Sequence, residues 1–169
     1  MQNHPIHNHP IELAAYDPQW PAQFEQEAAQ LLPIFGNNLV EIHHIGSTSI
    51  PGLMAKPLID MMPVVYDLNE VDGINEKMEA LGYICMGELG IPGRRFFCKS
   101  LKKRTHNVHV FQQGDPNIDR HLKFRDVLRQ HPELAEEYAQ LKMKLAKANQ
   151  DDRKAYTDGK TEFIRRVES

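Results

Sequence analysis

Residues able to do chemistry gather in one short stretch of the chain. Gly46-Ser47-Thr48-Ser49 places three hydroxyl side chains after a glycine, and Asp60 follows with 12 residues between it and Ser47. Glycine lets backbone amides approach a phosphate closely, and neighbouring hydroxyls can bond its oxygens. A carboxylate beside such a loop can hold the magnesium ion that screens a phosphate chain. The pattern predicts a site for a phosphorylated ligand, with Ser47 and Asp60 as candidate catalytic residues.

A single cation lies between this loop and its carboxylate. The first 93 residues contain 12 acidic residues and only two basic ones, Lys56 and Lys77. Lys56 can therefore meet a phosphate as a point charge. The alternative interpretation is structural: a buried carboxylate needs a partner, and Asp60 can be paired with Lys56 or with an arginine.

Two strands are expected to position the loop and the carboxylate. Residues 41–45 are expected to form a short strand that ends at the glycine. Residues 58–65 form an apolar run whose one charge is Asp60. Side chains alternate along a strand, so Met62 is expected on the same face as Asp60.

The remaining patterns predict an α+β fold, a mixed sheet over about residues 40–111 followed by helices over about 115–168. Strands are expected at 83–86, 94–100 and 105–111, the last two forming a hairpin. Three helices are expected after residue 115. Two helices are expected before residue 83. The first is capped by Asp17, starts at Pro18 and is ended by Pro33 and Gly36. The second is capped by Asp67 or Asn69 and is ended by Gly82.

Positive charge is concentrated in one segment. Residues 94–104 hold six basic residues and no acidic one: Arg94, Arg95, Lys99, Lys102, Lys103 and Arg104. Such a segment on an acidic body attracts phosphates, and the alternative is a solvated hairpin tip. Because side chains alternate along a strand, one of Arg94 and Arg95 is expected to face the site. The sequence does not determine which of the two does so.

Composition bounds the class of protein. The chain has 169 residues and is 41% hydrophobic, which predicts one globular domain over residues 12–169. Its net charge of −3 argues against a general nucleic-acid binder without excluding RNA. Residues 1–11, with His4, His7 and His9, are expected to be a flexible tail able to catch a metal. No apolar run is long enough to span a bilayer, and no secretory signal is visible. A cytoplasmic location without a membrane partner is therefore expected. In that reducing compartment Cys85 and Cys98 are expected to be thiols.

The longer stretch around the loop is more specific than its glycine and serine alone. His44-Ile45-Gly46-Ser47-Thr48-Ser49-Ile50-Pro51-Gly52-Leu53, with Lys56-Pro57 and Asp60, resembles the hallmark of the GrpB family, a bacterial family related to the nucleotidyltransferase superfamily. The likeness covers roughly residues 11–167. It includes Gly93-Arg94-Arg95-Phe96-Phe97, Asn107-Val108-His109-Val110, Phe124-Arg125-Asp126-Val127-Leu128-Arg129, Tyr138, Leu141-Lys142, Leu145-Ala146, Tyr156, Lys160 and Phe163-Ile164. The resemblance implies a nucleotidyltransferase-like sheet core followed by a helical segment.

The same resemblance implies a depleted metal site. Active members of the superfamily have a second acid two positions after the first and a third on a later strand, positions that Met62 and His109 occupy here. Magnesium would then depend on Asp60, phosphates and water, whereas a softer metal could use Asp60 and His109. GrpB-like sequences tend to have His-x-His on the later strand, and Asn107 departs from it.

The resemblance also assigns roles to the C-terminal helices. In the superfamily such helices cover the triphosphate and base, which makes Lys142, Tyr156 and Lys160 candidate substrate-binding residues. Tyr156 and Lys160 are four residues apart and share a helix face, so they can stack on a base and hold a phosphate. The alternative is a packing tyrosine and a solvated lysine.

Three functions stay open on the sequence. The first is a magnesium-dependent nucleotidyltransferase that uses a nucleoside triphosphate and an acceptor that the sequence does not identify. The second is a non-catalytic nucleotide or coenzyme A-related binding module, because domains of this type are found joined to dephospho-coenzyme A kinase, which makes a coenzyme A biosynthesis enzyme a candidate partner. The third is a protein-binding scaffold.

Overall fold

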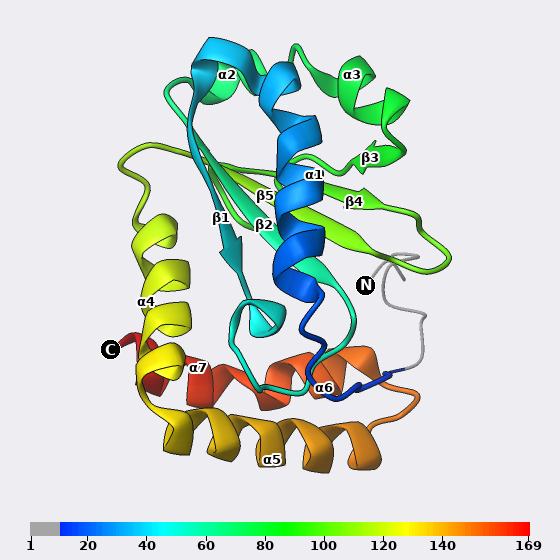
Figure 1. Cartoon of the computed structure of the whole chain (residues 1–169), viewed down its shortest axis with the longest axis vertical. Coiled ribbons are helices and arrows are strands. Elements are labelled where there is room, and N and C mark those ends of the chain that lie inside the picture. Colours follow the sequence, from blue (N-terminus) through cyan, green and yellow to red (C-terminus); the bar gives the residue numbers. More distant parts are fainter. Residues whose placement is uncertain (1–10) are drawn as a thin grey trace.

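A five-stranded mixed sheet forms the centre of the molecule. The computed structural model describes residues 11–169 (Figure 1). The strands are β1 (Leu39–Ile45), β2 (Ile59–Val65), β3 (Tyr83–Cys85), β4 (Arg94–Lys99) and β5 (His106–Gln112), in the order β1-β2-β5-β4-β3. β2 and β5 are parallel, and all other neighbours are antiparallel. The predicted α+β class, the mixed sheet and the β4–β5 hairpin are confirmed.

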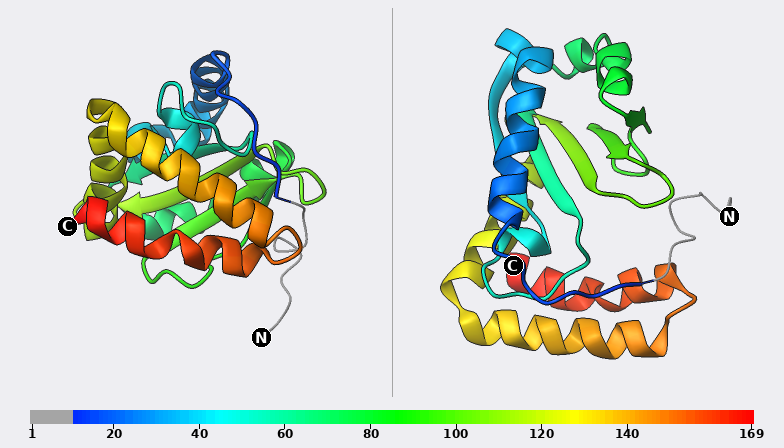
Figure 2. Two further views of the ribbon diagram at one scale, coloured as in Figure 1. Left: turned by 90° about the horizontal axis from the view of Figure 1, so that it is seen from below. Right: turned by 45° about the vertical axis from the view of Figure 1, so that its right-hand side comes forward.

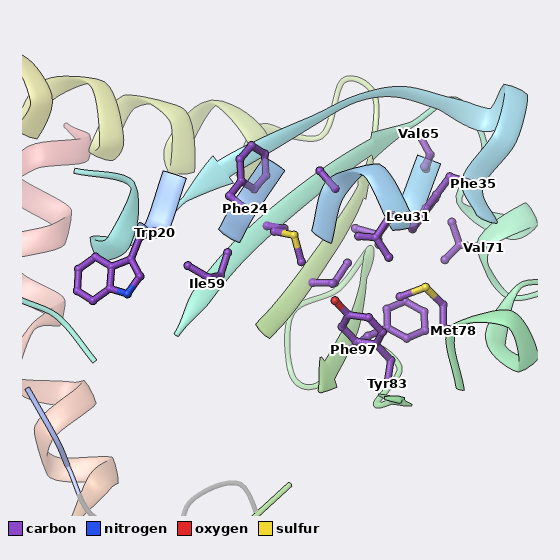
Figure 3. Packing of buried hydrophobic residues seen from close by; sticks show 14 of the residues in the cluster. Trp20, Phe24, Leu31, Phe35, Ile59, Val65, Val71, Met78, Tyr83 and Phe97 are labelled. Carbon is purple, nitrogen blue, oxygen red and sulfur yellow. The ribbon is translucent and has the colours of Figure 1, made fainter. Parts of the chain in front are cut away.

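The main core lies between one sheet face and the helices before and after β1 and β2. α1 (Trp20–Phe35) lies across this face and directs Phe24, Leu31 and Phe35 toward the strands (Figure 3). α2 (Leu68–Val71) and α3 (Asn75–Ala80) extend the same core. Apolar burial of this kind is the dominant stabilising term of a domain of this size.

Helix boundaries in this region differ from the predicted ones. α1 begins at Trp20 and not at Pro18. The Asp17 carboxylate accepts the Gln19 amide hydrogen at 2.8 Å, so this bond lies before the first helical turn. It continues past Pro33 to the buried Phe35, since a proline in the last turn removes only its own amide bond. The second predicted helix is two short ones, and the break contains Gly73, a residue of low helix propensity. Asp67 caps the first of them, as predicted.

The other sheet face is covered by a helix of the C-terminal segment. α4 (Pro116–Gln130) packs Ile118 and Leu122 on an apolar cluster of Ile45, Met62 and Phe111. α5 (Pro132–Ala148), α6 (Arg153–Gly159) and α7 (Thr161–Glu168) then lie across the end of the sheet where β1 ends and β2 begins (Figures 1 and 2). The prediction of three C-terminal helices is wrong by one, because the last predicted helix divides at Lys160. Short 3₁₀ turns at Gly36–Asn38 and Ser47–Ser49 complete the described elements.

The predicted N-terminal tail lies outside the described residues except for its last position. Ile11 is buried in a cluster with Ala146 and Tyr156. His4, His7 and His9 are not among the described residues. Within residues 11–169, no helix has both the length and the apolar character that crossing a membrane requires.

Candidate functional site

The loop after β1 brings its glycine against the carboxylate of β2. Gly46 has φ 73°, and Ser47–Ser49 form a single 3₁₀ turn after it. Because Ile45 pairs with Asp60 across the two strands, the loop begins directly beside Asp60. A Cβ atom at position 46 would lie 2.7 Å from Asp60 Oδ2. Only glycine satisfies both the backbone conformation and this approach.

Two of the three predicted phosphate-binding hydroxyls serve the loop itself. The Ser49 hydroxyl donates to the Gly46 carbonyl at 2.5 Å, and the Thr48 hydroxyl donates to the Leu58 carbonyl at 3.2 Å. His44 Nε2 lies 3.0 Å from the Thr48 hydroxyl, whose hydrogen is already used, so Nε2 carries the donated hydrogen. Burial lowers the pKa of His44 to about 4, which keeps this ring neutral. The internal bonds give Thr48 and Ser49 a structural role that the sequence pattern did not distinguish from ligand binding.

The remaining hydroxyl, Ser47, faces the C-terminal helices. Burial raises the pKa of Tyr138, and a hydrogen bond with the Ser47 side chain opposes that shift. The loop residues Ile50 and Leu53 pack in the same apolar cluster as Tyr138 and Phe163. The loop therefore rests on α5 and α7.

Three cationic side chains donate to carbonyl groups of the loop and of the end of β1. From α4, Arg125 donates to the His44 carbonyl at 3.2 Å and Arg129 donates to the Ser49 carbonyl at 2.9 Å. From α5, the buried Lys142 donates to the Met54 carbonyl at 2.5 Å. Sequence reasoning assigned no role to the two arginines. Their spacing of four residues on one helix face is the signal that was available.

Asp60 is bonded by two side chains from β5. Asn107 Nδ2 and His109 Nε2 lie 3.2 Å and 3.0 Å from Asp60 Oδ1. Burial alone raises the pKa of the Asp60 carboxyl, but the His109 hydrogen bond, the Asn107 hydrogen bond and the charge of Lys56 oppose that effect, and the net shift is downward. The predicted structural partner was Lys56 or an arginine, whereas the partners found are His109 and Asn107.

The neighbours of His109 indicate its protonation. An Arg94 terminal nitrogen lies 3.5 Å from His109 Nδ1, and a guanidinium can only donate. Nδ1 is then the acceptor and Nε2 carries the hydrogen given to Asp60. In this state His109 orients Asp60, and its predicted metal-binding role would require that hydrogen to leave.

Strand alternation separates the two candidate arginines. Arg94 is buried on the Asp60 face, donating to the Glu88 and Leu89 carbonyls at 3.1 and 2.9 Å. Arg95 points to the opposite face, where its Nε donates to Asp72 at 2.7 Å. The structure thus places Arg95, a predicted substrate-binding residue, on the face away from Asp60, because neighbouring strand residues face opposite ways.

Three buried or half-buried lysines from distant segments have depressed pKa values, and two of them, Lys56 and Lys160, interact with the Asp60 carboxylate. Burial, with the charges of Lys160 and Arg153, lowers the pKa of Lys56 to about 7. Burial also lowers the pKa of Lys142 to about 7 and that of Lys160 to about 8. Within residues 11–169, none of the three lysines forms an ion pair with a carboxylate, and the carboxylate that attracts Lys56 and Lys160 is Asp60. Arg153, which sequence reasoning missed, adds to this positive field.

The ring of Tyr156 contacts two of these lysines. Its ring is fully buried, with Lys56 Nζ at 5.3 Å and Lys160 Nζ at 4.6 Å from the ring centroid. This geometry matches the packing alternative for Tyr156 and leaves no open ring face for a base. Lys160, in contrast, is half-buried rather than solvated.

The donor atoms fit a metal only together with a ligand. Within residues 11–169, no group of three or more histidine, cysteine, aspartate or glutamate side chains is arranged to hold a metal ion. Met62 is fully buried in an apolar cluster, so the second acid position contributes nothing polar. Oxygens do remain: Asp60 Oδ2 faces the loop, and Asn107 Oδ1 is buried without a hydrogen-bond partner in the described part of the chain. Two oxygens suit magnesium if phosphates and water supply the rest.

A Gly-Ser loop between two strands, with a carboxylate on the second strand beside it, is the arrangement of a nucleotidyltransferase-like domain. The solved structure of Cid1 in complex with the UTP analog UMPNPP has this fold, with a TM-score of 0.54 at 13% identity, over 80% of this chain and 43% of that one. The nucleotidyltransferase-like fold is thus confirmed.

The chain belongs to the GrpB family, because the family model described as GrpB protein matches residues 10–169. The crystal structure of GrpB from Enterococcus faecalis superimposes with a TM-score of 0.89 at 42% identity, covering 93% of this chain and 94% of that one. The UPF0157 protein YqkA of Bacillus subtilis is 48% identical over 94% of this chain, which spans only 46% of YqkA. A dephospho-CoA kinase of Mycolicibacterium paratuberculosis is 26% identical over 92% of this chain and 44% of its own length.

Proposed function

We propose that this protein binds the phosphates of a nucleoside triphosphate at Gly46 and Ser47, between Asp60 and the C-terminal lysines. One observation carries the proposal: Lys56, Lys142 and Lys160 are at least half-buried with depressed pKa values and no ion-pair partner in the described chain. Like charges that repel each other in a poorly solvated place raise the free energy of the empty site. A phosphate chain removes that repulsion.

Each part of the site has a separate task in this proposal. The Gly46 backbone comes close to Asp60, and the amides of Ser47 and Thr48 with the Ser47 hydroxyl would bind phosphate oxygens, since the Ser49 and Ile50 amides bond within the turn. Asp60 Oδ2 and Asn107 Oδ1 are the oxygens that would hold magnesium, which supplies neutralisation of phosphate charge when bound. His109 keeps the Asp60 carboxylate oriented and ionised. The fold shared with Cid1, solved with a UTP analog, supports a nucleotide as the ligand.

A nucleotidyltransferase is the catalytic form of this function. Positioning and electrostatic stabilisation account for most of the rate enhancement in phosphoryl-group chemistry, so few protein groups need to react. The alternative is a binding module without catalysis. It is favoured by the apolar Met62 at the second acid position and by the match to a dephospho-CoA kinase, which suggests a coenzyme A-related ligand or partner.

Calorimetric titration tests the proposal. ATP, CTP, GTP, UTP and coenzyme A are titrated with and without magnesium into the wild type, Asp60→Asn and Lys160→Met. Lys77→Met is the matched control, because Lys77 is an exposed helix lysine on α3. We expect nucleotide binding that weakens by about tenfold in Lys160→Met and is unchanged in Lys77→Met.

The outcomes separate the two forms of the function. Binding that needs magnesium, is lost in Asp60→Asn and is accompanied by pyrophosphate release supports the transferase. Binding that is independent of metal and survives Asp60→Asn supports the module. If none of the five compounds binds, the proposal fails and the scaffold hypothesis remains.

A further inference from the structure

A cavity lies beside the Asp60 site. It has a volume of about 450 Å³ and is formed by the segment before β2, the tip of the β4–β5 hairpin, the start of α6 and Glu12. This volume lies in the range of small-molecule binding sites. We call it the basic pocket, after its lining cations Lys56, Lys102, Lys103, Arg104 and Arg153.

The charge of the basic pocket is opposite to that of the chain. Within residues 11–169, five cations line the pocket against one carboxylate, that of Glu12, while the whole chain has a net charge of −3. Burial lowers the pKa of Arg104, and burial with the charge of Arg104 lowers that of Arg153. Concentrated positive charge on an acidic protein attracts anions selectively to that place.

The lining favours a phosphorylated small molecule over a nucleic acid strand. Among the residues that the structure describes, its apolar lining consists of Pro57 and Leu58 and includes no aromatic side chain. Proteins that bind single strands usually stack bases on aromatic rings along an extended groove. A cavity with cations, one threonine hydroxyl at Thr105 and no stacking surface suits a compact phosphate-bearing ligand.

We propose that the basic pocket is a second anion-binding site that takes a phosphorylated small molecule next to the Asp60 site. Lys56, Arg104 and Arg153 line the pocket and also act electrostatically on Asp60, so the two sites are contiguous. The role of this ligand as acceptor rests on the proposed function: a triphosphate at Gly46 would meet an acceptor entering from the pocket. The binding itself does not depend on that function.

Amide NMR spectra of the labelled chain, titrated with inorganic pyrophosphate, locate the bound anion. We expect shifts of the amides of residues 102–105 and 153. Lys102→Ala/Lys103→Ala removes two exposed cations and should weaken pyrophosphate binding at these residues about fivefold. The matched control is Lys144→Ala/Lys147→Ala, which removes two exposed cations from α5, outside the pocket, and should leave the affinity within about twofold.

The amide shifts distinguish the basic pocket from the triphosphate site, because the amides followed at the two sites belong to different residues. Shifts confined to Gly46 and Ser47 would overturn the second site while supporting the proposed function. Shifts confined to residues 102–105 and 153 would support the second site and count against the proposed function. Equal weakening in both double variants, or tighter binding of a single-stranded oligonucleotide than of pyrophosphate at residues 102–105, would overturn the proposal.

Discussion

Asp60 carries the negative charge that two lysines of the site attract. Its carboxylate is 23% exposed, bonded to His109 at 3.0 Å and attracted by Lys56. Replacing Asp60 with asparagine removes the negative charge that attracts Lys56 and Lys160. We expect Asp60→Asn to reduce the free energy of unfolding by about 1–3 kcal/mol at neutral pH.

The pH dependence of this loss has a defined sign. The folded pKa of Asp60 lies below its ordinary value of 3.8, so its stabilisation is complete well above that pH and disappears as pH falls through the folded pKa. Urea unfolding at a series of pH values should show wild type and Asp60→Asn converging in acid. Asp151→Asn, at an exposed carboxylate, is the control. Equal stability of wild type and Asp60→Asn at neutral pH would contradict this account.

Lys56 links ligand binding to pH. Its pKa of about 7 is set by burial and by Lys160, Arg153 and Arg104, against the attraction of Asp60. Above that pH the free side chain is neutral, so a phosphate must bind together with a proton. Triphosphate affinity should therefore fall as pH rises from about 7 to about 9, by up to about tenfold per unit for each proton taken up.

An arginine at this position provides the comparison. Lys56→Arg stays charged over the whole range and should flatten part of the decline, leaving the contributions of Lys142 and Lys160. Calorimetry at each pH measures both slopes. An identical slope in wild type and Lys56→Arg would exclude Lys56 as the titrating group.

At the residue scale, the sequence predicted the centre of the site better than its periphery. Gly46, Ser47 and Asp60 lie together as their spacing implied. Whether Arg94 or Arg95 faces inward depends on the pleat, which one-dimensional spacing does not determine. Arg153 was missed because only the tertiary fold brings α6 beside β2.

At the element scale, the β1–β2 loop depends on one glycine. Gly46→Ala introduces both a strained φ of 73° and a Cβ atom 2.7 Å from Asp60 Oδ2. Gly52→Ala in the same loop has a similar φ of 80° but nothing within 4 Å of the new atom. Backbone strain should cost each variant about 1–2 kcal/mol, and Gly46→Ala should lose more because the carboxylate must move.

The two alanine variants also differ in function. Nucleotide binding should be lost in Gly46→Ala and kept in Gly52→Ala, as measured by urea unfolding together with calorimetry. Equal destabilisation of the two variants would mean that the close approach of Gly46 to Asp60 has no energetic role.

Element types were easier to predict than their ends. A continuous apolar run identified β2, because a strand buried on both faces is rich in apolar residues. The ends of α1 and the division at Gly73 depend on local hydrogen bonds and packing that periodicity does not describe. Likewise, the division at Lys160 lies within a single regular apolar pattern.

At the scale of the whole molecule, the C-terminal helices support the site by packing under the loop. Phe163 of α7 stacks on Tyr138 with a centroid distance of 4.9 Å, in the cluster that contains Ile50 and Leu53 of the loop. Phe163→Ala should reduce the free energy of unfolding by about 3–5 kcal/mol through the cavity it leaves. It should also weaken nucleotide binding, because the helices that carry Lys142 and Lys160 lose their contact with the loop.

An exposed leucine serves as the control for this prediction. Leu32 on α1 is 53% exposed, so Leu32→Ala should change stability by less than about 0.5 kcal/mol. Chemical denaturation of both variants gives the comparison. Nucleotide binding that stays at the wild-type level in a folded Phe163→Ala protein would show that the helices act independently of the loop.

The position of a bound triphosphate tests the central claim most directly. The measurement is a crystal structure with a non-hydrolysable nucleoside triphosphate and manganese, whose anomalous scattering locates the metal. The account predicts phosphates at the Gly46 and Ser47 backbone, manganese beside Asp60 Oδ2, and Lys160 within reach of a phosphate oxygen. Phosphates bound elsewhere, with the Gly46 loop and the lysines unchanged and uncontacted, would contradict it.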